Sequence, residues 1–100
     1  MRRTTAMVFA LTLLAFPAAA QDPSIGARLA ERWCMACHVV EPSQSMATDT
    51  APSFRIIAAR PVTTAGSLDR YLSRGHTLMP DFSLSSQERG ALIAYILSLR

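Results

Sequence analysis

The chain has 100 residues, half of them hydrophobic, a length that allows one domain at most. Its ten basic residues are all arginines, and they outnumber the seven acids by three. Two of these arginines, Arg2 and Arg3, fall in a predicted leader, so the rest of the chain carries eight arginines against seven acids, a net charge of +1. This near balance excludes the strongly basic footprint of a nucleic-acid-binding domain.

Residues 1–20 have the layout of a secretory signal peptide. A positive head at residues 1–3 precedes an apolar run at residues 6–16, and three alanines end the segment. This pattern predicts cleavage before Gln21. The rival interpretation is a membrane anchor, but the apolar run of about 11 residues is shorter than the ~20 that a spanning helix needs. We therefore expect a mature domain of residues 21–100 in an oxidising compartment, the periplasm.

The first half of the mature chain predicts one helix followed by a long loop. Asp22-Pro23 is typical of a helix start, with Asp as N-cap and Pro in the first turn. Apolar residues then recur every four positions, at Ile25, Leu29 and Trp33. Residues 39–63 contain three prolines and predict a loop with one short helical turn at residues 54–59. So long a loop is unusual in a compact domain unless it wraps around something.

The second half predicts two more helices. The first covers about residues 64–74, with Gly75 as its C-terminal stop. After a loop, Ser85 and Glu88 form a capping-box pattern that begins a last helix, which extends to about Leu99. No segment alternates as a strand does, so the predicted fold class is all-α.

The size of the mature chain predicts a buried group. About 80 residues form only a marginal hydrophobic core, and chains of this size commonly add disulfides, a metal or another buried group. The two cysteines, Cys34 and Cys37, are three positions apart, so a bond between them would constrain the unfolded chain very little. The missing part of the core is therefore expected to be a large apolar object.

Residues 34–38, with the sequence CMACH, form a C-x-x-C-H motif, which is typical of covalent haem attachment. Near the end of a helix, Cys34 and Cys37 share one face, so each thiol can add to one vinyl group of the porphyrin. His38 then lies under the iron and can offer a ring nitrogen as an axial ligand. The motif predicts one covalently bound haem c.

Three other interpretations of these residues are weaker. A thioredoxin-like C-x-x-C requires a βαβ unit, and the sequence predicts no strand. A zinc site requires four ligands; His76 could be the fourth, but the adjacent Cys37 and His38 are awkward around one tetrahedral ion. A simple disulfide between Cys34 and Cys37 leaves the core incomplete.

The second axial position has four candidate ligands in the sequence: Met35, Met46, His76 and Met79. Met35 lies inside the attachment motif and cannot reach the far face of a haem. Met79 lies about forty residues further on, beside Pro80, which is far enough for the chain to pass around the haem edge. A methionine is also a common core filler, so this spacing alone does not decide the ligand.

The mature chain resembles the small class I cytochromes c of bacteria. The resemblance is carried by four segments, Cys34-Met35-Ala36-Cys37-His38, Ala51-Pro52-Ser53-Phe54, His76-Thr77-Leu78-Met79-Pro80 and Leu92-Ile93-Ala94-Tyr95. It implies a class I cytochrome c fold, in which three main helices and long loops wrap around one covalently attached haem.

The resemblance also implies roles for individual residues. It points to Met79 as the distal iron ligand opposite His38, with His76 as a competitor that would lower the redox potential. It points to the carbonyl of Pro52 as the acceptor for the ring N–H of His38, which would orient that ring. Gly26 is expected to pack against Leu92 and Tyr95 of the last helix. Four arginines could pair with the haem propionates or simply be solvated, namely Arg55, Arg60, Arg70 and Arg74.

Two departures from the family limit what is carried over. Ala30 stands where the family often has an aromatic residue, four positions before the first cysteine. The lysine-rich face of the mitochondrial relatives is absent, so docking through a ring of lysines is not expected.

With both axial positions filled by protein, the iron would have no open site for a substrate. The sequence therefore predicts a periplasmic one-electron carrier, not an enzyme, that exchanges electrons with a dehydrogenase, a membrane complex or an oxidase. One alternative is a fixed haem c subunit of a periplasmic oxidoreductase complex. Another is a haem-based ligand sensor or peroxidase domain, in which the methionine leaves the iron. No nucleic-acid partner and no membrane span after signal cleavage are expected.

Overall fold

The computed structural model describes residues 22–44, 51–75 and 78–100, and within these ranges the protein is helical, without strands. The described ranges contain four helices, α1 (Pro23–Trp33), α2 (Phe54–Ala59), α3 (Ala65–Leu72) and α4 (Ser86–Ser98). Three longer helices and one short one confirm the all-α prediction. The predicted signal peptide lies outside the described residues, so export stays a prediction.

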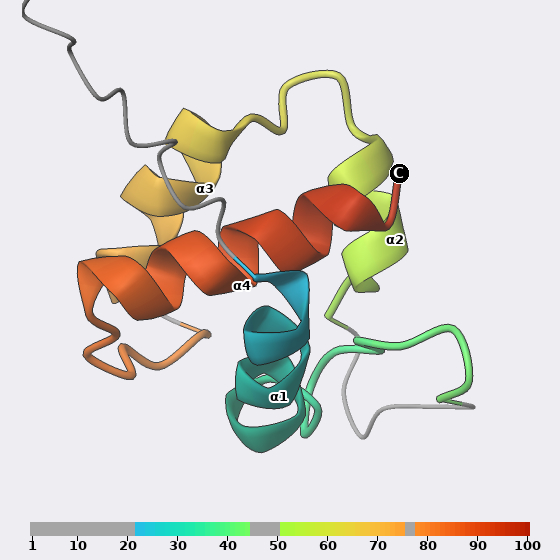
Figure 1. Cartoon of the computed structure of the whole chain (residues 1–100), viewed down its shortest axis with the longest axis horizontal. Coiled ribbons are helices and arrows are strands. Elements are labelled where there is room, and N and C mark those ends of the chain that lie inside the picture. Colours follow the sequence, from blue (N-terminus) through green and yellow to red (C-terminus); the bar gives the residue numbers. More distant parts are fainter. Residues whose placement is uncertain (1–21, 45–50, 76–77) are drawn as a thin grey trace, which may run out of the picture.

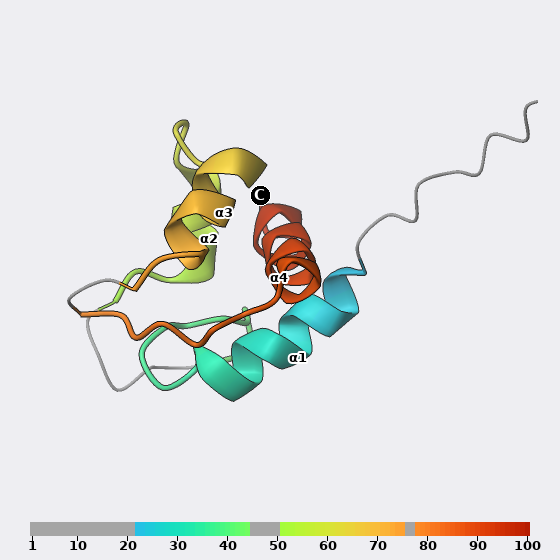
Figure 2. The ribbon, with the colours of Figure 1, turned by 90° about the vertical axis from the view of Figure 1, so that its left-hand side faces the viewer.

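Helix α4 lies at the centre of the arrangement. Figure 1 shows α1 crossing below it, with α3 and α2 on its other side. Figure 2, a quarter turn away, shows that the described residues directly before α4 pass beside the end of α1. In the described ranges, no helix is both long and apolar enough to cross a membrane.

The helices begin where local sequence predicts. The Asp22 carboxylate accepts a hydrogen bond from the Ser24 backbone N–H at 2.9 Å, and Pro23 opens α1. The capping box at α4 is formed in both directions: the Ser85 hydroxyl accepts from the Glu88 N–H at 3.1 Å, and the Glu88 carboxylate accepts from the Ser85 N–H at 2.9 Å. Each bond satisfies an N–H group that has no partner within the helix.

The predicted helix stop at Gly75 is wrong. Helix α3 ends at Leu72, and Ser73 caps it in a right-handed conformation with its N–H bonded to Asp69 O at 3.0 Å. No described glycine has the positive φ of a left-handed cap. Gly75 instead lies close to the following loop, since a Cβ on it would be 3.3 Å from the Cβ of Asp81.

The crossing of α1 and α4 depends on Gly26. A Cβ at this position would overlap the backbone carbonyl of Ala91 and lie 2.7 Å from the Cβ of Tyr95. The expected contact with Tyr95 is therefore confirmed, whereas the nearest neighbour is the backbone of Ala91 and not Leu92. Ala30, one turn further along α1, is fully buried. An aromatic residue would not fit there without moving the helices apart.

The buried residues form one cluster around α4. Four members come from α4 itself, namely Leu92, Ile93, Tyr95 and Ile96. Others come from the remaining elements, namely Ala30, Cys34, Val40, Phe54, Ala58 and Leu68. The Tyr95 hydroxyl donates to the Val40 carbonyl oxygen at 2.5 Å, which fastens the loop after the CMACH motif to α4. This loop is thereby held against the core.

Candidate functional site

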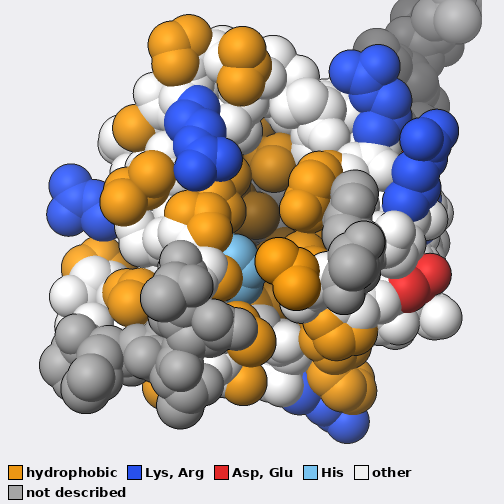
Figure 3. All heavy atoms as spheres, turned by 180° about the vertical axis from the view of Figure 1, so that it is seen from behind, with side chains coloured by type: hydrophobic (Ala, Val, Ile, Leu, Met, Phe, Trp, Pro, Cys, Tyr) orange, Lys and Arg blue, Asp and Glu red, His pale blue; other side chains and the backbone are white. Residues whose placement is uncertain are grey.

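A cavity of about 1060 Å³ opens on one face of the molecule. Its walls come from the end of α1, from α2, α3 and α4, and from the segment before α4. Figure 3 shows this face, with hydrophobic side chains gathered around a hollow and a histidine side chain visible inside it. The volume lies slightly above the roughly 300–1,000 Å³ usual for cofactor sites.

The cavity brings together all five residues of the predicted site. Its lining includes Cys34, Cys37, His38, Pro52 and Met79. The other lining side chains are mostly apolar, among them Phe54, Leu68, Leu92 and Ile96. A cavity that is apolar around a few polar groups suits a large flat apolar cofactor.

The His38 ring is held in one orientation. Its Nδ1 lies 2.6 Å from the carbonyl oxygen of Pro52, so this nitrogen carries the proton that it donates. The Phe54 ring, which is buried, packs on the imidazole with 5.3 Å between ring centroids, and Tyr95 backs Phe54 at 6.4 Å. Nε2 is consequently left as the nitrogen with a free lone pair, which is what a metal ligand needs.

Gln44 holds the backbone around the motif, and sequence reasoning missed it. Its side-chain oxygen accepts from the Val40 N–H at 2.9 Å, and its amide nitrogen donates to the His38 carbonyl at 3.1 Å. A glutamine in a polar loop has no sequence signal that would distinguish this role. The backbone of the motif is also closed by the His38 N–H, which donates to Cys34 O at 2.9 Å.

Both cysteines are free thiols. Burial, with a smaller contribution from the charge of Cys37, raises the pKa of Cys34 to about 11, so its thiol stays protonated at neutral pH. In the described part of the chain, no three His, Cys, Asp or Glu side chains converge as metal ligands. Because both cysteines are free, the disulfide alternative does not match the structure. The fourth ligand of the zinc alternative, His76, lies outside the described residues.

Two of the four candidate axial ligands can be placed. Met79 is partly buried and lines the cavity, whereas Met35 does not line it and is 44% exposed. The structure thus agrees with the argument that Met35 cannot face the distal side. Met46 and His76 lie outside the described residues. Ligation by His38 and Met79 stays a prediction.

The structure shows which of the four candidate arginines for the haem propionates line the cavity. Arg60 and Arg70 line it, whereas Arg55 and Arg74 do not. Arg32 lines it as well, and the sequence did not indicate this. No aspartate or glutamate is found among the described lining residues. The acid and base side chains of the described wall are therefore arginines and His38, with no carboxylate among them, which suits a group that bears carboxylates.

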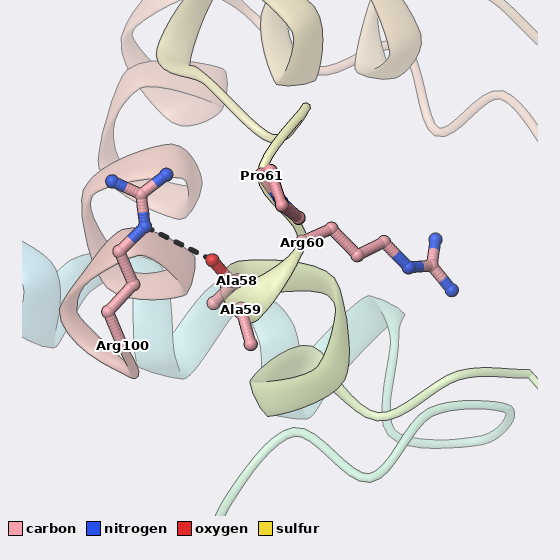
Figure 4. Close-up of a pocket in the computed structure, with 5 residues that line it drawn as sticks. All are labelled: Ala58, Ala59, Arg60, Pro61 and Arg100. Carbon is pink, nitrogen blue, oxygen red and sulfur yellow. Dashed lines mark hydrogen bonds between the residues drawn. The ribbon is translucent and has the colours of Figure 1, made fainter.

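A second cavity, of about 440 Å³, lies between α2 and the C-terminal end of α4. Figure 4 shows Arg100 closing one side by donating from Nε to the Ala58 carbonyl oxygen, at 3.1 Å, while the Arg60 side chain points away from Arg100. Its wall consists of Ala58, Ala59, Arg60, Pro61 and Arg100. These residues include no nucleophile and no metal ligand, so the chemistry belongs to the larger cavity.

These observations fit a covalently attached haem. The larger cavity has two unpaired thiols, an imidazole whose Nδ1 is held by a carbonyl, a thioether sulfur and a mostly apolar wall. Haem iron in electron-transfer proteins is commonly held by one histidine and one methionine. The fold and the site therefore define a small helical haem protein of the c type.

Comparison with known proteins leads to the same class. The family model described as cytochrome c oxidase, cbb3-type, subunit III matches residues 21–96. The cytochrome c-552 of Bradyrhizobium diazoefficiens is 42% identical over 98 residues, covering 98% of this chain and 94% of the relative. No solved structure matches the chain. The chain belongs to this cytochrome c family, whose members carry a covalently bound c-type haem and transfer electrons.

Proposed function

We propose that the protein is a periplasmic one-electron carrier in which Cys34 and Cys37 hold the haem and His38 and Met79 ligate its iron. The observation that carries this proposal is that all four residues line the same, mostly apolar cavity. A relative named cytochrome c-552 that matches almost end to end supports a stand-alone carrier. The signal-peptide pattern of residues 1–20 supports the compartment.

The bound haem supplies a reversible one-electron couple, and the chain sets the conditions around it. The Pro52 carbonyl holds His38 by its Nδ1 proton, which fixes the ring orientation and leaves the other ring nitrogen for the iron. Phe54 and Leu92, both buried, exclude water from the cavity wall. With Met79 at the remaining axial position, the iron would be closed to small ligands.

The first experiment determines the haem, its linkage and its ligands together. Visible and near-infrared spectra of the exported protein, recorded with and without acid–acetone extraction, should show a haem that resists extraction and a methionine–iron charge-transfer band. The Met79→Ala variant should lose that band and bind carbon monoxide when reduced. Met35→Ala is the matched control because Met35 lies outside the cavity lining, and it should keep the band.

The assignment to Met79 fails if its alanine variant retains the band. A parallel Met46→Ala variant would then identify the alternative methionine. N-terminal sequencing of the periplasmic fraction tests the leader separately, and the expected first residue is Gln21.

A second candidate function is a fixed haem c subunit of an oxidoreductase complex. It is favoured by the description of the matching family, which names a subunit of a cbb3-type oxidase. Size-exclusion chromatography of gently solubilised native membranes discriminates the two. Elution with a catalytic subunit supports the fixed subunit, whereas recovery as a small soluble protein supports the carrier.

A further inference from the structure

The segment that carries Met79 has no regular secondary structure, and its local bond from the Ser83 N–H to Asp81 Oδ1, at 2.8 Å, lies within the segment itself. No backbone–backbone hydrogen bond between described residues involves residues 78–84. Leu78, directly before the methionine, is 95% exposed and so contributes almost no burial. Ser83 adopts a left-handed conformation, with φ of 53°, which is unfavourable for a residue other than glycine. Such a segment keeps its place only if side chains anchor it.

Two anchors are visible. At the end nearer α4, the Leu84 carbonyl accepts from Arg89 Nη1 at 2.8 Å, and Arg89 Nε also bonds Asp69 of α3 at 2.9 Å. Nearer the methionine, the Phe82 ring packs on the indole of Trp33, with ring centroids 5.3 Å apart and planes tilted by 34°. Of the two anchors, this second one is the closer in sequence to Met79.

Trp33 is well placed to act as an anchor. It is the last residue of α1 and is bonded directly to Cys34, so it moves with the covalent attachment point. Helix α1 is itself held against α4 at Gly26, where the backbones touch. The Arg32 guanidinium lies 4.9 Å from the indole centroid, a cation–π contact that further restricts the ring.

We propose that the Trp33–Phe82 stack is the latch that holds the Met79 segment over the cavity, which makes Trp33 and Phe82 positioning residues for the distal iron ligand. The inference rests on the proposed ligation by Met79. The latch connects the two halves of the haem site, because one ring is fixed beside a thioether cysteine and the other lies three residues after the methionine. Without it, Met79 is away from the iron for a larger fraction of the time.

Binding of imidazole to the oxidised holoprotein measures this fraction. Imidazole can reach the iron only when the methionine has left, so its apparent affinity scales with the open population. An aromatic pair of this geometry should shift that population by about threefold to tenfold. Trp33→Ala and Phe82→Ala should each tighten imidazole binding by this factor. Trp33→Phe, which keeps a ring, should stay near the wild-type value.

Ile25→Ala is the matched control, because Ile25 is a partly exposed apolar residue of the same helix that does not line the cavity. It should leave imidazole binding unchanged. The double variant Trp33→Ala/Phe82→Ala should bind no tighter than the stronger single variant. Independent haem contacts would instead multiply the two single effects, and that result would overturn the latch.

The latch and the assignment of Met79 as ligand can be refuted by different results. If the Met79→Ala variant keeps the charge-transfer band, both the ligand assignment and the latch are wrong. If Met79→Ala loses the band while Trp33→Ala and Phe82→Ala bind imidazole as the wild type does, the ligand assignment holds and the latch is refuted. Should Trp33→Ala not assemble with haem, Phe82→Ala alone decides the matter.

Discussion

Replacing Gly26 with alanine should force α1 and α4 apart. Ordinary van der Waals contact begins near 3.4 Å, whereas the new Cβ would be 2.7 Å from Tyr95 Cβ, so this neighbour must retreat by about 0.7 Å. The overlapping carbonyl of Ala91 must move further, and it belongs to the backbone of a helix. Overpacking costs about 1–3 kcal/mol, and a rigid neighbour puts the cost near the upper end. Alanine regains about 1 kcal/mol of helix propensity, so the expected net loss is about 2 kcal/mol.

Gly66→Ala is the matched control for this substitution. Gly66 also lies in a helix, α3, but a Cβ there would meet only the Thr64 hydroxyl, at 4.0 Å. This variant should be stabilised by about 0.4–1 kcal/mol. Equilibrium unfolding of the holoproteins in guanidinium, followed by the fluorescence of the single tryptophan, Trp33, measures both. A Gly26→Ala protein within about 0.5 kcal/mol of the wild type would refute the close-crossing argument.

The remaining predictions concern the loop anchor and the attachment site. Tyr95→Phe leaves the Val40 carbonyl without its buried donor and should lower the free energy of unfolding by about 1–2 kcal/mol at neutral pH. Burial raises the pKa of Tyr95 above its ordinary value of 10. The hydroxyl's contribution to the free energy of unfolding is therefore present below pH 10 and declines as the pH rises further. A stability difference between wild type and variant that stays constant to pH 11 would contradict this. The double variant Cys34→Ala/Cys37→Ala cannot attach haem and should lose most of its helical circular dichroism, because the cavity of about 1060 Å³ is then unfilled. A colourless variant with a cooperative thermal transition would show that the chain does not need haem for its core.

The local sequence was sufficient to predict those helix ends that are determined by interactions between residues close together in the chain. The starts of α1 and α4 were predicted from Asp22, Ser85 and Glu88, because a cap bonds backbone groups only two or three residues away. The end of α3 was not predicted correctly. Gly75, three residues beyond Leu72, would cap the helix only if it adopted a left-handed conformation, and it does not. Ser73 ends the helix with an ordinary right-handed conformation, and Gly75 serves the approach of Asp81.

By itself, the sequence determined the chemistry of the attachment motif, because Cys34, Cys37 and His38 are neighbours in the chain and their geometry follows from one helical turn. Only the tertiary structure decided which distant residues face the cavity. It placed Arg60 and Arg70 on the wall but not Arg55 and Arg74, and it brought Phe82 against Trp33. The physical reason is that such contacts depend on how helices cross and where loops return, and these are set by packing over the whole core. A local pattern of residues cannot predict that packing.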